Sequence, residues 1–188
     1  MKRLIFLLII TVMTFSFIAC TNKNEKDINQ QGAHRNDLLT MAIGSEPEEG
    51  FDPVLGWGRY GSPLIQSTLV ETNSKMEIIG DLAKDYHISE DGITWTFSLR
   101  EDAYFTDGEK VTSKDVVFTY EKAKESNTVV DLTVMESITA INDYTVEFKL
   151  KHPESTFIYS IAKTGIVPQH AYNDTYGDNP IGSGPFKL

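Results

Sequence analysis

The residues best suited to holding a ligand lie in one glycine-rich loop, residues 56–61, which reads Gly-Trp-Gly-Arg-Tyr-Gly. Arg59 offers a planar fork of donors that suits a carboxylate, while Trp57 and Tyr60 offer flat apolar faces with a polar N–H or O–H. The glycines permit close approach of the backbone to a ligand. The alternative is that Trp57 packs in the core and Arg59 pairs with a nearby acid, and both interpretations stay open. The acids nearest in the sequence are Glu46, Glu48, Glu49 and Asp52.

Patterns for catalysis or for a metal site are absent from the sequence. No two of the four histidines share the i, i+4 spacing of a metal-binding helix, and each is expected on the surface. The sequence also lacks the GxSxG, Walker and GxGxxG motifs, so no activated nucleophile or phosphate site is predicted. We therefore expect a binding protein without a cofactor or a bound metal of its own, and not an enzyme. The histidines are His34, His87, His152 and His170.

The N-terminus has the order of a secretory signal peptide, predicted over residues 1–19: Lys2 and Arg3, an apolar run, then small Ala19. The run is too short for a transmembrane helix, which needs about 20 apolar residues. Cys20 follows directly and is the only cysteine, so it cannot form an intramolecular disulfide. Its position resembles the lipobox of bacterial lipoproteins, which implies lipidation at Cys20. Residues 20–37 are polar and aperiodic, and predict a lipid-anchored flexible tether.

The charge balance argues against nucleic acid as a partner. Of 17 basic side chains, cleavage before Cys20 removes Lys2 and Arg3 and leaves 15, against 27 acidic ones, for a formal charge of −12. A protein that binds phosphate backbones needs a basic surface. The remaining residues are enough for one domain with its own core.

The apolar pattern predicts a mixture of strands and helices that must position the loop. Asp91-Gly92 and Asn142-Asp143 each predict the turn of a hairpin, the first followed by a strand over residues 93–99. Thr112 and Asp115 have the spacing of a capping box at the start of a helix. Ser62-Pro63 predicts another helix start, directly after the loop. Further expected elements are a strand at 38–43, a short helix at 157–161, a strand or strand end at 166–168, and a loop and strand over 182–188.

Several segments together resemble the extracellular solute-binding proteins of family 5, the oligopeptide, dipeptide and nickel receptors of bacterial ABC importers. These segments are residues 83–102, 105–108, 112–116, 166–170 and 182–186. The resemblance implies an α/β (mixed α+β) fold of the periplasmic-binding-protein type II class. It further implies that residues 38–188 form an incomplete first lobe with its small subdomain, and that the second lobe is absent.

The resemblance also implies a ligand and partners. The 50–64 stretch looks most like the receptors for nickel and metal–chelator complexes, in which Arg59 would meet carboxylates of the chelator. Lys163 and Thr164 occupy a segment that often lines the cleft of this family. The expected partners are a small-molecule ligand, an ABC permease and ATPase complex, and the outer face of the membrane. The alternatives are an oligopeptide or dipeptide receptor and a truncated lipoprotein that transports nothing.

Overall fold

The computed structural model describes residues 40, 49–59, 61–126 and 130–188 of the chain. The chain divides into two units, residues 1–44 and 45–188. All helices and strands of the described residues belong to the second unit. The predicted signal peptide and tether, Cys20, Tyr60 and the expected strand at 38–43, apart from Thr40, lie outside the described residues.

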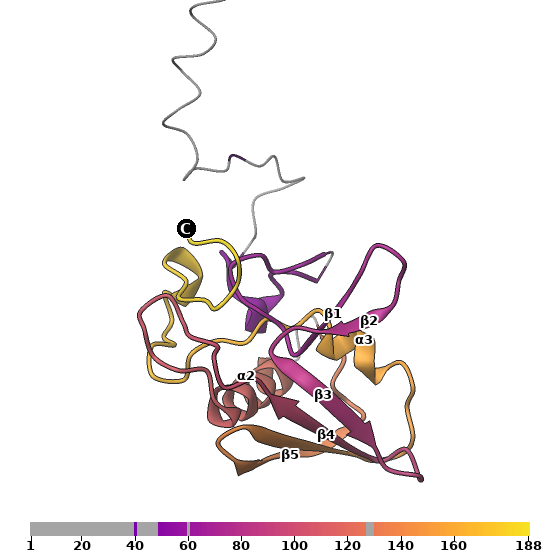
Figure 1. Cartoon of the computed structure of the whole chain (residues 1–188). Helices are drawn as coiled ribbons and strands as arrows, with labels where there is room; N and C mark the ends of the chain where they lie inside the picture. The colour runs from indigo at the N-terminus through magenta and orange to yellow at the C-terminus, as the bar shows by residue number, and fades with distance from the viewer. Residues whose placement is uncertain (1–39, 41–48, 60, 127–129) are drawn as a thin grey trace, which may run out of the picture. The chain divides into compact units, whose positions relative to one another are not determined.

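A four-stranded antiparallel sheet is the main element of this unit, with the strand order β3-β4-β6-β5 (Figure 1). The hairpin predicted at Asp91-Gly92 joins β3 (Ala83–Ile88) to β4 (Thr94–Leu99), with Gly92 at φ 71°. The hairpin predicted at Asn142-Asp143 joins β5 (Met135–Asn142) to β6 (Thr145–Leu150). Both predicted hairpins are therefore confirmed.

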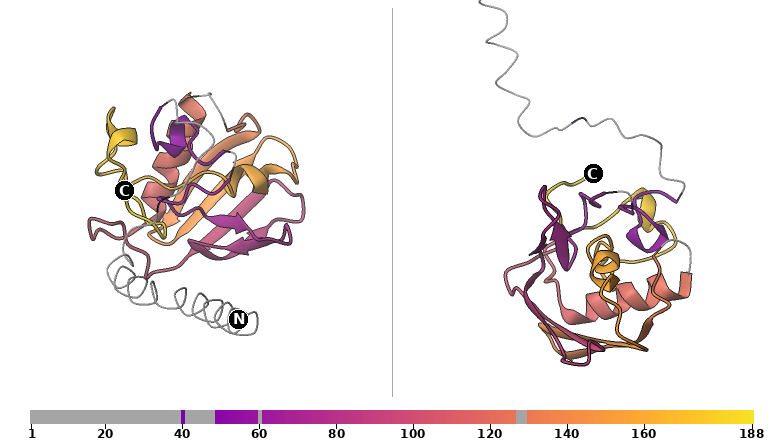
Figure 2. Two further views of the ribbon diagram at one scale, coloured as in Figure 1. Left: turned by 90° about the horizontal axis from the view of Figure 1, so that it is seen from above. Right: turned by 90° about the vertical axis from the view of Figure 1, so that its right-hand side faces the viewer.

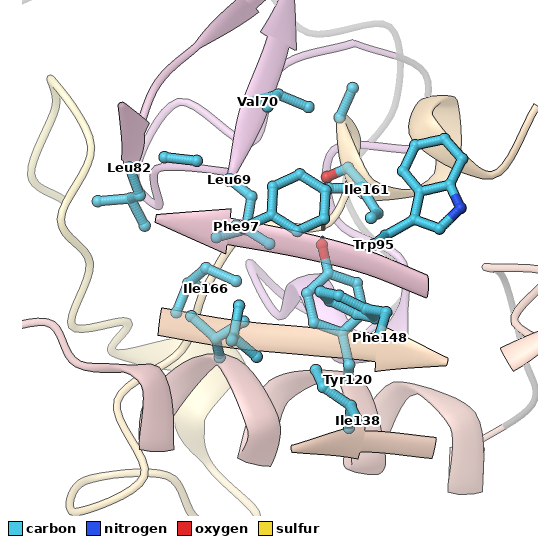
Figure 3. Close-up of a cluster of buried hydrophobic side chains, with 14 of the residues drawn as sticks. Leu69, Val70, Leu82, Trp95, Phe97, Tyr120, Ile138, Phe148, Ile161 and Ile166 are labelled. Carbon is cyan, nitrogen blue, oxygen red and sulfur yellow. Dashed lines mark hydrogen bonds between the residues drawn. The ribbon is translucent and has the colours of Figure 1, made fainter. Parts of the chain in front are cut away.

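Helix α2 (Ser113–Ser126) packs on one face of this sheet and closes the core (Figure 2). The side chains of β4 alternate as the pattern predicted, with Trp95, Phe97 and Leu99 buried on the helix side. Phe148 of β6 lies between the sheet and Tyr120 of α2 (Figure 3). The core is thus a layer of aromatic and aliphatic side chains between one helix and one sheet.

The start of α2 forms one half of the predicted capping box, with Asp in the place of Glu, because the Thr112 hydroxyl donates to Asp115 Oδ2 at 2.9 Å and does not accept from the Asp115 N–H. The Thr112 N–H donates to Asp115 Oδ2 at 2.9 Å, and the Asp115 N–H donates to the Thr112 carbonyl at 3.1 Å. The second carboxylate oxygen, Asp115 Oδ1, accepts from the Gln169 N–H at 3.0 Å. One turn further on, the Thr119 hydroxyl accepts from the Val167 N–H at 3.0 Å. The helix therefore fixes residues 166–169 along its length.

These bonds explain why residues 166–168 form no strand in the structure, although one was expected there. The N–H of Val167 is taken by a helix side chain, and that of Ile166 donates to the Ser67 carbonyl at 2.8 Å. The segment is extended, but its partners alternate between a helix and a loop, so no ladder forms. Both Ile166 and Val167 are fully buried, as their apolar character predicted.

Shorter elements surround the helix and the main sheet. Strands β1 (Val70–Thr72) and β2 (Ile78–Gly80) form a separate antiparallel pair. Helix α3 (Phe157–Ile161) confirms the short helix expected there. Two 3₁₀ turns, η1 (Pro53–Leu55) and η2 (Tyr176–Asp178), lie close together beyond one end of α2 (Figure 2).

The helix predicted from Ser62-Pro63 is wrong, because this stretch is extended and irregular. The Ser62 hydroxyl accepts from the Leu64 N–H at 3.4 Å, as a cap would, but Leu64 has φ 53°, outside the helical range. The carbonyls that a helix would use internally accept bonds from distant segments. The Ile65 carbonyl accepts from the Gly184 N–H at 2.8 Å, and the Leu69 carbonyl from the Ala83 N–H at 2.9 Å. Tertiary contacts have overridden a local start signal.

The same contacts account for the last residues of the chain. Residues 182–188 were expected to form a loop and a strand, and the structure assigns no strand to them. They lie beside Leu64 and Ile65, with the Phe186 N–H donating to the Leu64 carbonyl at 3.3 Å. Gly182 is required there, since a Cβ on it would come within 2.0 Å of the Ile65 carbonyl oxygen.

Among the described residues, no helix is both long enough and apolar enough to cross a bilayer.

Candidate ligand-binding site

The predicted ligand loop is shaped by a carboxylate at its start and glycines after it. Asp52 Oδ1 accepts from the Val54 N–H at 2.9 Å and starts the η1 turn, which ends at Gly56 with φ 116°. Gly58 has φ 89°, and a Cβ on it would lie 2.9 Å from the Cβ of Pro63. The chain can fold back on itself this tightly only because position 58 lacks a side chain.

Trp57 holds this loop closed. Its indole N–H donates to the Pro63 carbonyl at 2.6 Å, and its ring meets Phe51 edge to face at a centroid distance of 4.8 Å. The side chain is half-buried, so part of the ring remains exposed. Trp57 therefore combines the two interpretations of the sequence: it packs within its own loop and still has a face that a ligand could contact.

Arg59 follows two positions later in the loop and is exposed to solvent. The backbone N–H of Arg59 donates to the Gly56 carbonyl at 3.3 Å, and this bond continues the turn. Of the acids considered as its partners, Asp52 is only 3% exposed and accepts from the Tyr172 hydroxyl at 2.8 Å. The carboxylate of Asp52 thus supports the loop through its bonds to Val54 and Tyr172.

A buried polar network anchors the loop to η2. Gln66 is 1% exposed, and its Nε2 donates to the Phe51 carbonyl and to the Tyr176 hydroxyl, both at 3.1 Å. The Tyr176 hydroxyl in turn donates to the Ile181 carbonyl at 2.7 Å. Burial raises the pKa of Tyr176 above its usual range, so this hydroxyl stays protonated as a donor. Gln66 Oε1 is buried and accepts no bond from the described residues.

The second predicted segment follows α3. Lys163 is exposed, whereas Thr164 is completely buried and its hydroxyl donates to the Ser160 carbonyl at 2.9 Å. Gly165 then packs against the loop: a Cβ on it would lie 2.7 Å from the Cβ of Gln66 and 3.0 Å from Cγ of Pro53. The structure therefore brings Gly165, which follows the predicted Lys163 and Thr164, into contact with residues on both sides of the predicted loop at 56–61.

The chemistry of this place is that of a cationic, partly aromatic surface on an acidic chain. Arg59 and Lys163 are exposed on two segments that touch, in a chain of formal charge −10. Such cations suit a carboxylate-bearing ligand, and Trp57 adds an apolar face. No three His, Cys, Asp or Glu side chains of the described residues are grouped so that they could hold a metal ion.

Replacing Asp52 by asparagine is expected to flatten part of the pH dependence of stability. Burial raises the pKa of Asp52 above its ordinary value of 3.8, and the bonds from Tyr172 and Val54 only partly oppose this. A carboxyl with a raised folded-state pKa stabilises the fold fully below its unfolded pKa and loses that contribution as pH rises through the folded value. From about pH 4 upwards, D52N should therefore lose less free energy of unfolding than the unchanged chain.

Urea unfolding at a series of pH values measures this difference, and Asp91→Asn is the control with the opposite sign. Hydrogen bonds from Ser89 and Ile93 lower the pKa of Asp91, so its contribution is present above its unfolded pKa and lost as pH falls. As pH rises, the free energy of unfolding of D52N should increase relative to that of the unchanged chain. That of D91N should decrease relative to the unchanged chain. Parallel profiles for D52N and the unchanged chain would contradict the role of burial at Asp52.

Comparison with known proteins now places this geometry in a family. The family model of the bacterial extracellular solute-binding proteins, family 5 (middle part), matches residues 77–188. The chain belongs to this family. The resemblance seen in the sequence is therefore confirmed, as is the mixed α/β fold of the periplasmic-binding-protein type II class.

Three relatives show how far the likeness of this family 5 chain extends. It is 37% identical over 135 residues to a Brucella ovis protein named as an ABC transporter peptide-binding protein, a match that covers 64% of this chain and 25% of the relative. NikZ from Campylobacter jejuni, solved with Ni(L-His), is 28% identical with a TM-score of 0.72, over 80% of this chain and 32% of NikZ. AppA from Bacillus subtilis, solved with a nonapeptide, is 26% identical with a TM-score of 0.62, over 76% of this chain and 32% of AppA. The chain thus spans between a quarter and a third of the length of these proteins.

The sequence did not reveal the buried residues that support the candidate site of this family 5 chain. Tyr172, Tyr176 and Gln66 belong to the network under the loop, but they lie up to 110 positions apart in the chain. One signal was present, because Gln66 follows two apolar residues and precedes Leu69 in a segment that is otherwise buried. A polar residue inside a buried segment needs hydrogen-bonding partners, and the sequence cannot say where they lie.

Proposed function

We propose that this chain forms part of an extracytoplasmic substrate-binding lipoprotein that captures a small ligand for an ABC importer. The observation that carries the proposal is membership of the solute-binding family over residues 77–188. The packing of Gly165 against Pro53 and Pro63 supports it, because it places the chain beside Lys163 next to the residues that flank the predicted loop. The binding activity belongs to a protein whose relatives are about three to four times longer than the stretch matched here.

The proposed ligand is nickel, or another metal, carried within a chelator. A bound chelate presents carboxylates, and the exposed guanidinium of Arg59 and ammonium of Lys163 could pair with them. The exposed part of the Trp57 ring would pack against the organic part of the ligand. NikZ, with its Ni(L-His) complex, supports this choice by its structural similarity. The metal is cargo in this proposal, held by the chelator and by residues of the longer protein.

An oligopeptide or dipeptide is the second candidate, and a specific finding favours it as well. AppA was solved with a nonapeptide, and the Brucella ovis relative is named as a peptide-binding protein. A peptide also ends in a carboxylate, so Arg59 could serve either ligand. The two differ in how the rest is held, because an extended peptide is bound mainly by main-chain hydrogen bonds along its length.

Replacing Arg59 by alanine in the intact protein tests the site. We expect ligand affinity to fall by about 1.5–3 kcal/mol, the usual loss for a hydrogen bond to a charged group. Calorimetric titration with a nickel–histidine complex and, separately, with a nonapeptide measures the loss and identifies the ligand class. Lys84→Ala removes an exposed cation of β3, away from the loop, and should leave affinity unchanged. Equal affinity of R59A and the unchanged protein for the ligand that binds would remove Arg59 from the site.

Anchoring through Cys20 is tested in cells by Cys20→Ala. The variant should leave the membrane fraction or retain its signal peptide, because the thiol that would carry the lipid is gone. Fractionation followed by immunodetection reports both results. Membrane-bound, lipid-labelled, processed C20A protein would rule the anchor out. With the anchor in place, the permease would receive the ligand at the outer face of the membrane, and the ATPase would drive its import.

A further inference from the structure

A hollow lies outside the candidate site and shares no residue with it. It is a pocket of about 310 Å³ at the tip of the β3–β4 hairpin, where the hairpin meets the start of α3. That volume is at the lower end of the range for small-molecule pockets. Its walls are mainly aromatic and aliphatic. The residues that matter are Tyr86, Ile88, Trp95, Pro153, Glu154 and Ile158.

The pocket exists because the core face of the sheet is incompletely covered at its edge. Tyr86 pairs with Phe97, and Ile88 with Trp95, so these side chains share the face that α2 and α3 cover elsewhere. β3 is the edge strand, and Tyr86 and Ile88 remain 38% and 36% exposed, whereas Trp95 is 3% exposed. On the other side of the pocket the chain turns closely: a Cβ on Gly92 would lie 3.2 Å from the Cβ of Pro153.

The aromatic walls are aligned. The rings of Tyr86 and Trp95 are nearly parallel, with an interplanar angle of 4° and centroids 6.5 Å apart. Phe157 meets Trp95 edge to face at 5.8 Å and supports the indole from the core side. Trp95 is also held by its N–H, which donates to the Gly92 carbonyl at 3.2 Å. Fixed aromatic faces of this kind attract apolar groups and cations.

A carboxylate completes the lining. Both the N–H and the hydroxyl of Thr156 donate to Glu154 Oε1, at 3.1 and 2.6 Å, and these bonds lower the pKa of Glu154. No described residue donates to its Oε2. The adjacent hairpin turn adds the exposed carboxylates of Glu90 and Asp91. His152 is near enough to Glu154 to act on its pKa, but no lysine or arginine lines the pocket.

We propose that this pocket binds a small organic cation with an apolar body, such as an arylalkylammonium ion. The apolar part would lie against Tyr86 and Trp95, and the charged group would pair with Glu154. A peptide added as a further strand along β3 fits less well. The Tyr86 N–H already donates to Asp85 Oδ1 at 2.8 Å, and an added strand would need an N–H of this kind to be available.

Titration of the full chain with 2-phenylethylammonium, followed by ¹⁵N NMR, tests the proposal. The indole N–H signal of Trp95 should shift saturably at millimolar concentration, and 2-phenylethanol, which is neutral, should bind more weakly. Glu154→Gln should weaken binding of the cation by up to about five-fold, the effect of a partly exposed ion pair. Glu125→Gln changes charge equally on α2, where Glu125 pairs with Lys122, and should have no effect.

A Trp57→Phe variant assigns the two indole signals. No saturable shift at Trp95 would overturn the pocket as a binding site. Equal affinity for the alcohol and the ammonium ion, or an unchanged affinity in E154Q, would overturn the choice of a cation. Shifts that spread along the amides of β3 with a basic peptide, but not with the small cation, would show a peptide site instead and would equally overturn the proposal.

Discussion

Replacing Phe148 by alanine is expected to lower the free energy of unfolding by about 3–5 kcal/mol, the usual cost of truncating a buried aromatic side chain. Phe148 is completely buried in β6. Its ring meets three others edge to face, with centroid distances of 5.5 Å to Phe97, 4.9 Å to Tyr120 and 5.7 Å to Phe157. The expected loss has two parts. One is the lost transfer free energy of the ring, and the other is the cost of the cavity that remains between the sheet and the helix.

Urea unfolding followed by circular dichroism measures this change. Ile141→Ala is the control, because Ile141 is 55% exposed on the edge strand β5 and its truncation should change stability by no more than about 0.5 kcal/mol. The two variants should therefore differ clearly in midpoint. If F148A unfolded at the same urea concentration as I141A, the layer between α2 and the sheet would not be the main core.

Replacing Gly165 by alanine is expected to cost about 1–3 kcal/mol of stability, the range for adding a methyl group to a packed site. The new Cβ would lie 2.7 Å from Gln66 Cβ, 3.0 Å from Pro53 Cγ and 3.1 Å from Pro63 Cγ. Two prolines and a buried glutamine cannot all move aside cheaply. The methyl group would separate the two segments of the candidate site, so ligand affinity of the intact protein should fall as well.

Gly61→Ala is the matched control for this substitution. Gly61 lies in the glycine-rich loop at 56–61, where a Cβ on it would meet nothing within 4 Å, so the change should be neutral or slightly stabilising. Thermal unfolding and ligand titration of both variants separate packing from a general effect of losing glycine. A G165A protein as stable as G61A, with unchanged affinity, would mean that contact between the two segments is not needed for binding.

The local parts of the fold could be predicted from the sequence because their causes are local. A turn dipeptide between alternating apolar residues predicts a hairpin, and both hairpins formed. The capping pair Thr112 and Asp115 predicted the start of α2 to within one residue. Ser62-Pro63 carried an equally local signal and failed, since Gly184 and Ala83 take the carbonyls that a helix would use. The residues next to Pro63 do not indicate which backbone groups of a distant segment will form hydrogen bonds with this stretch.

The members of the candidate site stay a prediction, and their packing could not be predicted. Arg59 and Lys163 are exposed, which is compatible with ligand-binding cations; Arg59 was named from its loop and Lys163 from the family resemblance. Thr164 is completely buried, and its hydroxyl is bonded to Ser160, so its proposed part in binding requires a movement of the segment or is limited to support. That the two segments touch depends on the small size of Gly165, which no periodicity reports.

The bonds from α2 to residues 166–169 have a consequence for the entropy of ligand capture. A segment without regular structure normally loses conformational freedom when it closes on a ligand, and that loss reduces affinity. Here Asp115 and Thr119 already hold the N–H groups of Gln169 and Val167, so the segment that follows Lys163 is ordered before any ligand arrives. The helix thereby gives the segment next to Lys163 in the candidate site its preorganisation.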